Sequence, residues 1–283
     1  MTKKLGAHLS TAGGHNRALE KTITIDGNCL QIFSSSPRSW SFADIEEEKM
    51  NNFKKLKETL EINLVYFHAS YLINLGDEGR IGNLSKQSLI AELNLAEKMG
   101  VEGSIIHIGS FKDRSDRLAQ DHEKYPILIK NSKEVLKAIP ENALFIIENA
   151  GMRKIGKSIK ELAQIIEDLD DDRVKVCLDT CHLHAAGYDL STKKKFNDFF
   201  EEFENLIGID KLELFHINDS RDELGSFRDR HANLGEGKIK MKVFELLLND
   251  VRFNKIPFII ETPGFDGKGP DKKNLDILKK LIK

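Results

Sequence analysis

Histidine and acidic residues recur at the ends of short apolar segments along this chain of 283 residues. One such residue at a strand end is commonly a capped or hydrogen-bonded structural group, but a whole series needs a common cause. Imidazole and carboxylate groups together are typical ligands of zinc, manganese or iron, and a set rich in histidine favours zinc. The series consists of His8, His68, His107, Glu148, Asp179, His216 and Glu261.

Two further clusters bring similar groups close together in the sequence. Asp179 and His182 lie three residues apart in Leu-Asp-Thr-Cys-His, so a helical turn after the strand can direct both into one site. Asp229 and His231 flank Arg230, and in an extended segment this spacing puts both side chains on one face. These clusters extend the candidate ligand set beyond the strand ends.

The other histidines are interpreted from their positions. His184 is close enough to Asp179 in sequence to compete as a ligand with the histidine two residues before it. We expect His8 to orient a ligand or a water molecule rather than to bind metal directly. His15 and His122 lie in helix-like or loop-like segments, and we expect them to be surface groups.

Short apolar runs that alternate with longer amphipathic stretches supply the elements that would position these residues. No linker rich in Pro, Gly or Ser interrupts the alternation, so we expect one α/β domain over residues 1–283, folded as a (β/α)₈ TIM barrel. The carboxyl ends of its strands converge on one face, where we expect the metal site. The expected strands are Lys4–Leu9, Cys29–Phe33, Asn63–His68, Ser104–Ile108, Ala143–Glu148, Val174–Asp179, Leu212–Ile217 and Pro257–Glu261, and the expected helices include Ser85–Met99, Tyr125–Ala138, Ile159–Leu169, Lys194–Leu206 and Lys240–Leu248.

Composition is typical of a soluble protein with a sizeable core, since 40% of residues are hydrophobic and 31% are charged. The chain shows neither a membrane-length apolar run nor a leader-like start, and we expect a cytoplasmic protein. Its three cysteines cannot all pair, and we expect reduced, buried thiols. The formal net charge of −2 does not by itself indicate a nucleic-acid binder, although local charge and bound cations can outweigh it.

Six separated segments resemble the endonuclease IV family, in order and from the first expected strand to the last. They read Leu5-Gly-Ala-His-Leu-Ser, Tyr71-Leu-Ile-Asn-Leu-Gly, Cys177-Leu-Asp-Thr-Cys-His, His216-Ile-Asn-Asp-Ser, Asp229-Arg-His-Ala-Asn-Leu-Gly-Glu-Gly and Glu261-Thr-Pro-Gly. The resemblance implies a zinc-dependent TIM barrel that hydrolyses DNA on the 5′ side of abasic sites, leaves a 3′-hydroxyl and cleans blocked 3′ ends. It also implies a monomer whose partner is double-stranded DNA.

Carried over position by position, the resemblance implies three zinc ions. His68 and His107 would bind the first and share Glu148 with the second. The second would also bind Asp179, His216 and Glu261, and the third would bind His182, Asp229 and His231, which selects His182 over His184. The chain departs from the family pattern at His107-Ile-Gly-Ser, where proline is common after the histidine, and at a short Glu148-Asn-Ala-Gly segment, but neither change removes a ligand.

The implied chemistry is attack by a hydroxide held between two zinc ions, because zinc lowers the pKa of bound water from ~15.7 to about 7. The third zinc would stabilise charge on the transition state and on the departing 3′ oxygen. Glu261 and Glu148 are the expected catalytic carboxylates, and Glu261 is expected to orient or deprotonate the attacking water. Three zinc ions would more than offset the formal net charge of −2, so this face would attract phosphate.

Access to a phosphodiester within a stacked duplex requires the DNA to bend and the abasic nucleotide to turn out. Arg38, Tyr71 and Leu72 match the intercalating positions of the family, and we expect them to form a wedge. The alternative is that Tyr71 and Leu72 pack beneath their loop. Arg230 is a further expected substrate contact. Basic residues that could extend the positive field, or could simply be solvated, are Arg38, Lys112, Arg114, Arg153, Arg228 and Arg230.

Two other functions are compatible with parts of this pattern. A sugar isomerase or epimerase also places acidic residues and histidine at the strand ends of a barrel around one or two metal ions, but it leaves His182, Asp229 and His231 without a purpose. A protein that recognises damaged DNA without cutting it would not need a complete ligand set. Counting bound metals tests the first alternative, and an incision assay tests the second.

Overall fold

Parallel strands close into a barrel in the computed structural model of this protein, which describes residues 3–40, 45–112, 117–151 and 154–283. Around the ring, each strand pairs in parallel with its neighbours in the order β1 (Leu5–His8), β10 (Phe258–Ile260), β7 (Leu212–His216), β6 (Val174–Asp179), β5 (Leu144–Glu148), β4 (Gly103–Ile106), β3 (Leu64–His68) and β2 (Cys29–Phe33). A separate antiparallel pair consists of β8 (Asp219–Ser220) and β9 (His231–Ala232).

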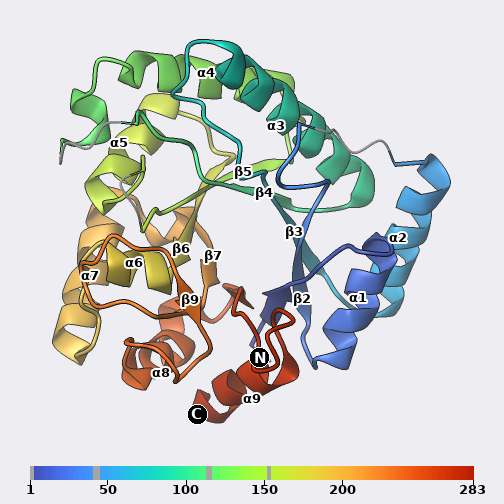
Figure 1. The fold of residues 1–283 in the computed structure, drawn as a ribbon, viewed down its shortest axis with the longest axis vertical. Coiled ribbons are helices and arrows are strands. Elements are labelled where there is room, and N and C mark those ends of the chain that lie inside the picture. Colours follow the sequence, from blue (N-terminus) through green and yellow to red (C-terminus); the bar gives the residue numbers. More distant parts are fainter. Residues whose placement is uncertain (1–2, 41–44, 113–116, 152–153) are drawn as a thin grey trace.

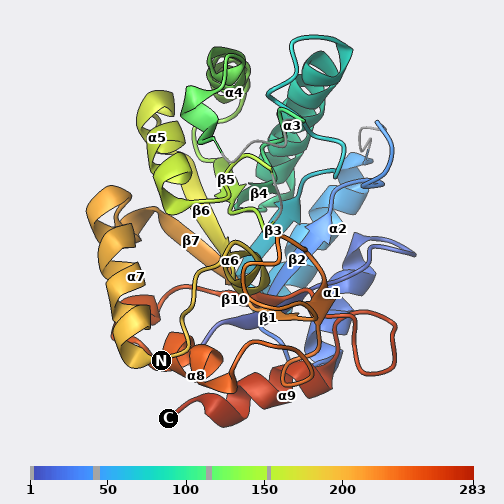
Figure 2. The ribbon, with the colours of Figure 1, turned by 60° about the vertical axis from the view of Figure 1, so that its left-hand side comes forward.

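Helices surround the strands, as Figure 1 shows, and Figure 2 shows the same arrangement from a second direction. The helices are α1 (His15–Thr24), α2 (Glu47–Thr59), α3 (Arg80–Met99), α4 (Tyr125–Ala138), α5 (Ile159–Leu169), α6 (Thr180–Ala185), α7 (Lys193–Leu206), α8 (Met241–Asn249) and α9 (Lys272–Leu281). Short 3₁₀ segments are Ala119–Asp121, Ile209–Lys211 and Val251–Phe253. The short helix α6 begins directly after β6, so it starts at the carboxyl end of a barrel strand.

The expected fold class is confirmed, because all eight expected strands form and each begins and ends within two residues of its expected limits. The largest difference concerns α3, which begins at Arg80 rather than at Ser85. The Asp77 carboxylate explains the earlier start, since it accepts backbone hydrogen bonds from Gly79 at 2.9 Å and Gly82 at 3.1 Å. A side chain that satisfies free N–H groups allows a helix to begin in a polar, glycine-containing segment.

Two layers of side chains fill the barrel interior. The first is an apolar layer, a buried cluster formed by Cys29, Tyr66, Ile105, Ile146, Cys177, Leu214 and Ile259. Because side chains alternate between the two faces of a strand, the residue two positions further along also points inward. These residues form what we call the polar layer, which consists of Gln31, His68, His107, Glu148, Asp179, His216 and Glu261. The alternation that builds the core therefore also positions the candidate ligands.

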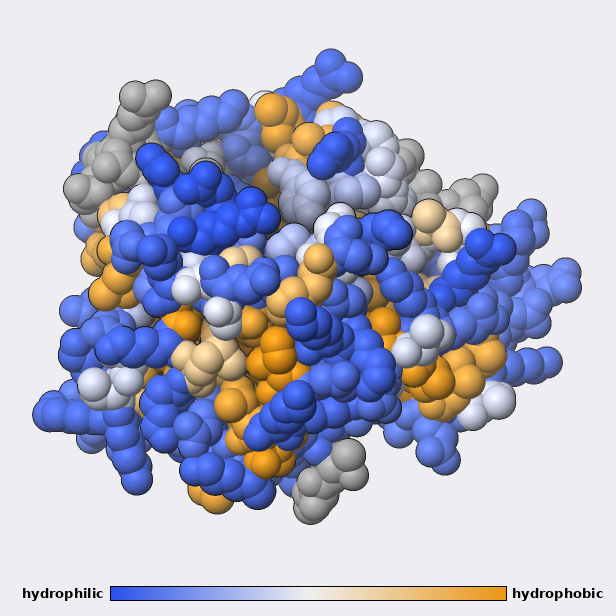
Figure 3. All heavy atoms as spheres, turned by 60° about the horizontal axis from the view of Figure 1, so that its bottom comes forward, coloured by the Kyte–Doolittle hydropathy of each residue, from blue (hydrophilic) through white to orange (hydrophobic). Residues whose placement is uncertain are grey.

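Polar side chains cover much of one face of the molecule (Figure 3). The face drawn in Figure 3 is largely hydrophilic, with apolar atoms in patches between the hydrophilic side chains. Among the described residues, we find no helix that combines the length and apolar character needed to cross a membrane. All three cysteines are buried and unpaired, as expected.

Candidate metal centre

The first group of donor atoms lies where β3, β4 and β5 end. His68 Nε2 and His107 Nε2 are each 3.3 Å from Glu148 Oε2. His68 Nδ1 donates a hydrogen bond to the Ala69 carbonyl oxygen at 2.8 Å. That bond places a ring proton on Nδ1 and leaves Nε2 facing Glu148. The structure thus brings together the three residues expected to bind the first zinc.

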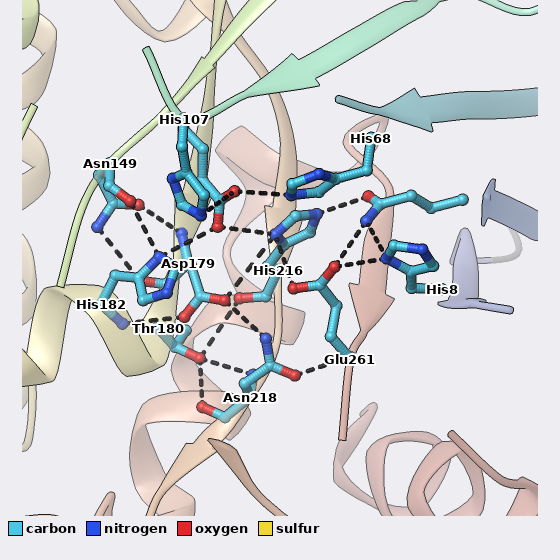
Figure 4. Close-up of polar contacts among 12 residues, drawn as sticks. His8, His68, His107, Asn149, Asp179, Thr180, His182, His216, Asn218 and Glu261 are labelled. Carbon is cyan, nitrogen blue, oxygen red and sulfur yellow. Dashed lines mark hydrogen bonds and ion pairs between the residues drawn. The ribbon is translucent and has the colours of Figure 1, made fainter. Parts of the chain in front are cut away.

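The second group lies between β5, β6, β7 and β10 and includes the other oxygen of Glu148. His216 Nδ1 is 3.1 Å from Glu148 Oε1, 3.4 Å from Glu261 Oε2 and 3.9 Å from Asp179 Oδ2. Glu148, Asp179 and His216 are fully buried, whereas the Glu261 side chain is 15% exposed. Figure 4 shows His216, Asp179 and Glu261 directed toward one another.

The third group is formed by α6 and the loop that leads into β9. His182 Nε2 and His231 Nε2 lie 3.0 Å and 3.3 Å from Asp229 Oδ1. Asp179 links this group to the second one, because its Oδ1 accepts the backbone N–H of His182 and so caps α6. The same cap directs the His182 ring inward. His184 points elsewhere, since its Nε2 lies 3.2 Å from the Asp222 carbonyl oxygen.

The donor chemistry of these groups fits zinc. Ligands bound about 2.0–2.1 Å from a tetrahedral zinc lie about 3.3 Å from one another, close to most of the nitrogen–oxygen distances given above. Buried polar atoms normally find hydrogen-bond partners, yet His182 Nε2 and His231 Nε2 are buried and make no hydrogen bond, although a carboxylate oxygen is nearby. Within each group the candidate ligand atoms lie within 4.8 Å of one another.

Electrostatics also favour a cation here. Four carboxylates converge on the site, and without metal only protonated imidazoles could offset their charge. Although burial lowers the pKa of His231, Asp179 and Asp229 raise it overall to about 9. In contrast, burial lowers the pKa of His107 to about 3 despite the charge of Glu148. A site that needs positive charge but keeps some of its imidazoles neutral is suited to metal ions.

Two thiols also approach these groups. Cys177 lies near Glu148 and His216, and Cys181 lies near Asp179. Burial raises the pKa of both thiols to about 12. Because a thiol binds zinc as thiolate, the carboxylates are the less costly donors in both places.

Two asparagines form hydrogen bonds that position the candidate ligands. Asn218 Nδ2 donates to Asp179 Oδ2 at 2.6 Å, and its Oδ1 accepts the backbone N–H of Glu261 at 2.7 Å. Asn149 Oδ1 accepts the backbone N–H of Asp179 at 2.6 Å, and the Asn149 carbonyl oxygen lies 3.0 Å from His182 Nδ1. The sequence pattern did not point to either asparagine, although Asn149 directly follows Glu148 and Asn218 lies two residues after His216.

His8 lies beside the second group without joining it. Its Nδ1 is 2.8 Å from Glu261 Oε1. Burial lowers the pKa of His8 in spite of the hydrogen bond to Glu261. The same Nδ1 also lies 2.8 Å from Gln31 Nε2. His8 Nε2 is buried and unpartnered beside the pocket. This position is compatible with the expected orienting role, which remains a proposal.

The other two histidines differ from expectation. The prediction that His15 and His122 are surface groups is wrong in part, because both are partly buried. The His15 ring lies edge-on to Phe53, with centroids 6.3 Å apart, and the His122 ring stacks on Phe111 at 4.2 Å. Apolar neighbours supplied by tertiary packing account for the difference.

An open pocket with a volume of about 520 Å³ gives access to the three groups. Six candidate ligands line it, together with His8 and Tyr71. Tyr71 is 59% exposed, Leu72 is half-buried and Arg38 is exposed. The loops that carry them are joined, since Tyr71 N donates to the Pro37 carbonyl oxygen at 3.2 Å. The three expected wedge residues therefore lie on two connected loops beside the pocket.

The expected basic residues are in different situations. Arg230 forms a two-point ion pair with Asp222, including a 2.7 Å bond from Nε to Oδ2, and its side chain is 53% exposed. Arg228 lies 3.6 Å from the same carboxylate. Lys112 is exposed. Arg114 and Arg153 lie outside the described residues. The ion pair with Asp222 thus fixes Arg230 and, with it, the segment that carries Asp229 and His231.

This chain is similar to known proteins over nearly its whole length. The AP endonuclease 2 family model, described as a xylose isomerase-like TIM barrel, matches residues 20–281. A probable endonuclease 4 from Sulfurihydrogenibium sp. is 33% identical over 99% of this chain and 99% of its own. The crystal structure of endonuclease IV from Thermus thermophilus matches with a TM-score of 0.85 and 31% identity, over 98% of both chains. A D-tagatose 3-epimerase-like protein, with a TM-score of 0.69 and 18% identity over 98% of this chain and 96% of its own, shares the fold alone. The chain therefore belongs to the endonuclease IV family.

Proposed function

We propose that this protein is a zinc-dependent DNA repair endonuclease that hydrolyses the phosphodiester on the 5′ side of an abasic site and leaves a 3′-hydroxyl. The observation that carries the proposal is the convergence of three donor groups on one pocket at the carboxyl ends of the strands. Full-length similarity to proteins named endonuclease 4 supports the same activity. We propose three zinc ions, bound by His68, His107, Glu148, Asp179, His182, His216, Asp229, His231 and Glu261.

Bound zinc would supply a water that ionises near neutral pH and positive charge for the phosphate oxygens. The chain itself supplies the spacing between the metal sites. Glu148 Oε2 faces His68 and His107, whereas Glu148 Oε1 faces His216, so one carboxylate joins two donor groups. We assign Glu148 this bridging role because it is fully buried and has little freedom to turn.

Glu261 is the second proposed catalytic carboxylate. Hydrogen bonds from His8 at 2.8 Å and from Gln31 at 2.7 Å hold its Oε1. Its Oε2 therefore faces the second donor group and the pocket. Although burial alone would raise the pKa of Glu261, the charge of His216 and the bond from His8 hold it below its usual range. An ionised oxygen fixed in this direction can orient the attacking water or accept its proton.

Tyr71, Leu72 and Arg38 are proposed to fill the gap that an extruded abasic nucleotide leaves in the duplex. The Tyr71 ring is exposed, yet it is supported by Phe33 at 5.4 Å and His68 at 6.0 Å between centroids. An aromatic ring that is packed on one side and exposed on the other can be inserted between base pairs with little loss of side-chain conformational entropy. Its exposure argues against packing beneath the loop.

Substrates of this proposed enzyme are double-stranded DNA with abasic sites and DNA with blocked 3′ ends, since both present a phosphodiester or phosphate to the same site. We propose that it acts as a monomer. Lys112, Arg228 and Arg230 lie in loops after strand ends and are proposed to add to the attraction for phosphate, with Arg230 also fixed by Asp222.

A sugar epimerase remains the main alternative on this barrel, because likeness to an epimerase-like structure shows the fold alone. The third donor group argues against it. An epimerase needs no counterpart of His182, Asp229 and His231, yet here α6, the Asp179 cap and the Asp229 loop all hold them together. We therefore favour the nuclease.

Zinc stoichiometry measured beside nicking of an abasic-site duplex tests the proposal. We expect three zinc ions per chain and incision on the 5′ side. His182→Ala should lose about one zinc and most activity, whereas His184→Gln, on the same helix, should retain both because glutamine can still donate to the Asp222 carbonyl oxygen. Fewer than three zinc ions in the wild type, or no incision at full zinc occupancy, would overturn the proposal.

A further inference from the structure

Gln31 belongs to the polar layer but has no part in the ligand set. It lies in β2, two residues after Cys29 of the apolar layer, and is completely buried. A buried primary amide needs partners for two donors and an acceptor. Its partners lie on three other strands, with His8 on the adjacent β1, Glu261 at the end of β10 and His216 on β7, which indicates a role in the site rather than in local structure.

The amide contacts two of the proposed zinc ligands. Gln31 Nε2 donates to Glu261 Oε1 at 2.7 Å, and Gln31 Oε1 accepts from His216 Nε2 at 2.6 Å. The ionised Glu261 carboxylate can only accept, so the amide nitrogen must face it. The amide oxygen then faces His216, and the proton of that ring must lie on Nε2. One side chain is thus placed to set both the tautomer of His216 and the direction of the Glu261 carboxylate.

Three of the other imidazoles obtain the same control from the backbone, whereas His107 Nδ1 is buried without a hydrogen-bond partner. His68 Nδ1 donates to the Ala69 carbonyl oxygen at 2.8 Å, and His182 Nδ1 pairs with the Asn149 carbonyl oxygen at 3.0 Å. His231 Nδ1 lies 3.3 Å from the Glu261 carbonyl oxygen. For His216 the hydrogen bond comes from the Gln31 side chain, so a substitution of Gln31 can remove it.

We propose that Gln31 is a positioning residue that fixes His216 with its Nδ1 lone pair toward the second donor group and fixes Glu261 with Oε2 toward the same point. The inference rests on the proposed function, since that point is the proposed second zinc site. Without Gln31, His216 Nδ1 could carry the proton and donate to Glu148 Oε1, 3.1 Å away, which would remove a zinc ligand. Outer partners of metal ligands typically change metal affinity by about 10–100-fold.

Two substitutions separate the contacts. Gln31→Met keeps the length of the side chain but neither donates to Glu261 nor accepts from His216. Gln31→Glu keeps an acceptor for His216 but replaces the amide donor to Glu261 with a carboxyl oxygen. Tyr66→Phe is the matched control, because it removes a part-buried 2.7 Å bond from Tyr66 of the apolar layer to Glu213, away from the ligands.

The experiment measures zinc affinity by chelator competition and records the histidine-ring N–H signals of zinc-loaded protein by ¹⁵N NMR. The proposal expects Gln31→Met to bind its weakest zinc about 10–100-fold less tightly and to shift or lose the His216 Nε2–H signal. Gln31→Glu should retain that signal, and Tyr66→Phe should match the wild type in both measurements. If Gln31→Met does not fold, Gln31→Glu becomes the test. Its spectrum should retain the His216 Nε2–H signal, which is identified by its loss in His216→Gln, and absence of the signal in Gln31→Glu would overturn the proposal.

The outcomes distinguish this inference from the proposed function. A wild-type protein without zinc would overturn both. A wild type with three zinc ions, together with unchanged affinity and an unchanged His216 signal in Gln31→Met, would overturn the role of Gln31 alone. Loss of zinc affinity in Tyr66→Phe as large as in Gln31→Met would assign the effect to general destabilisation and would equally overturn it.

Discussion

Replacing Glu261 by glutamine should separate DNA binding from incision. The variant keeps the shape of the side chain, but its amide has one donor end. The Oε1 position already receives hydrogen bonds from His8 and Gln31, so the amide oxygen must take that place. The NH₂ group must then occupy the Oε2 position, where it faces the second donor group and cannot bind metal or accept a proton.

The expected loss in kcat is at least about 10²-fold, which corresponds to about 2.7 kcal/mol of transition-state stabilisation. Binding of abasic duplex DNA should change little, because the proposed wedge and basic loops are intact. Single-turnover nicking gives the rate, fluorescence anisotropy gives the affinity, and elemental analysis shows whether zinc is lost with the charge. Glu213→Gln is the control, since it keeps the acceptor for Tyr66 outside the polar layer. A zinc-loaded Glu261→Gln enzyme with a near-native rate would refute this account of the carboxylate.

Exhaustive chelation should abolish incision and zinc should restore it, because the proposed site consists of metal ligands; undiminished cutting by protein shown to be metal-free would contradict this. Tyr71→Ala combined with Leu72→Ala should impair cutting of an abasic duplex far more than cleavage at a frayed 3′ end, and equal losses on both substrates would assign the two residues to packing. Hydrogen bonds from Arg173 lower the pKa of Asp171, so this pair stabilises the fold above the unfolded pKa of about 3.9 and less as pH falls through the folded value. The difference in Tm between wild type and Asp171→Asn should therefore narrow from pH 7 to pH 3, and a constant difference would exclude this contribution.

The strands and the candidate ligands were predictable from the sequence because both follow from local chemistry. Inward-facing residues alternate along a parallel strand, so an apolar residue followed two positions later by His, Asp or Glu indicates a core layer capped by a polar layer. Ile146 and Glu148 form one such pair, and Leu214 and His216 form another. Neighbouring residues also predicted the helical turn that joins Asp179 to His182.

Contacts between distant segments could not be obtained in this way. The choice between His182 and His184 depends on the Asp179 cap and on the place of the Asp222 carbonyl oxygen across the loop. Gln31 follows the same period-two alternation as the ligands, but an amide in a strand gives no sign of its partners. Those partners are 185 and 230 residues away in the chain.

The charge of individual groups was also decided only by the tertiary structure. Arg230 reads in the sequence as a free cation beside two candidate ligands, whereas in the fold it forms an ion pair with Asp222 that holds the loop. His107 and His231 are the same residue type, yet burial lowers the pKa of the first to about 3, while carboxylates from β6 and the Asp229 loop raise that of the second to about 9. The type of each residue is given by the sequence, but its solvation and the electrostatic field around it depend on every segment that packs nearby.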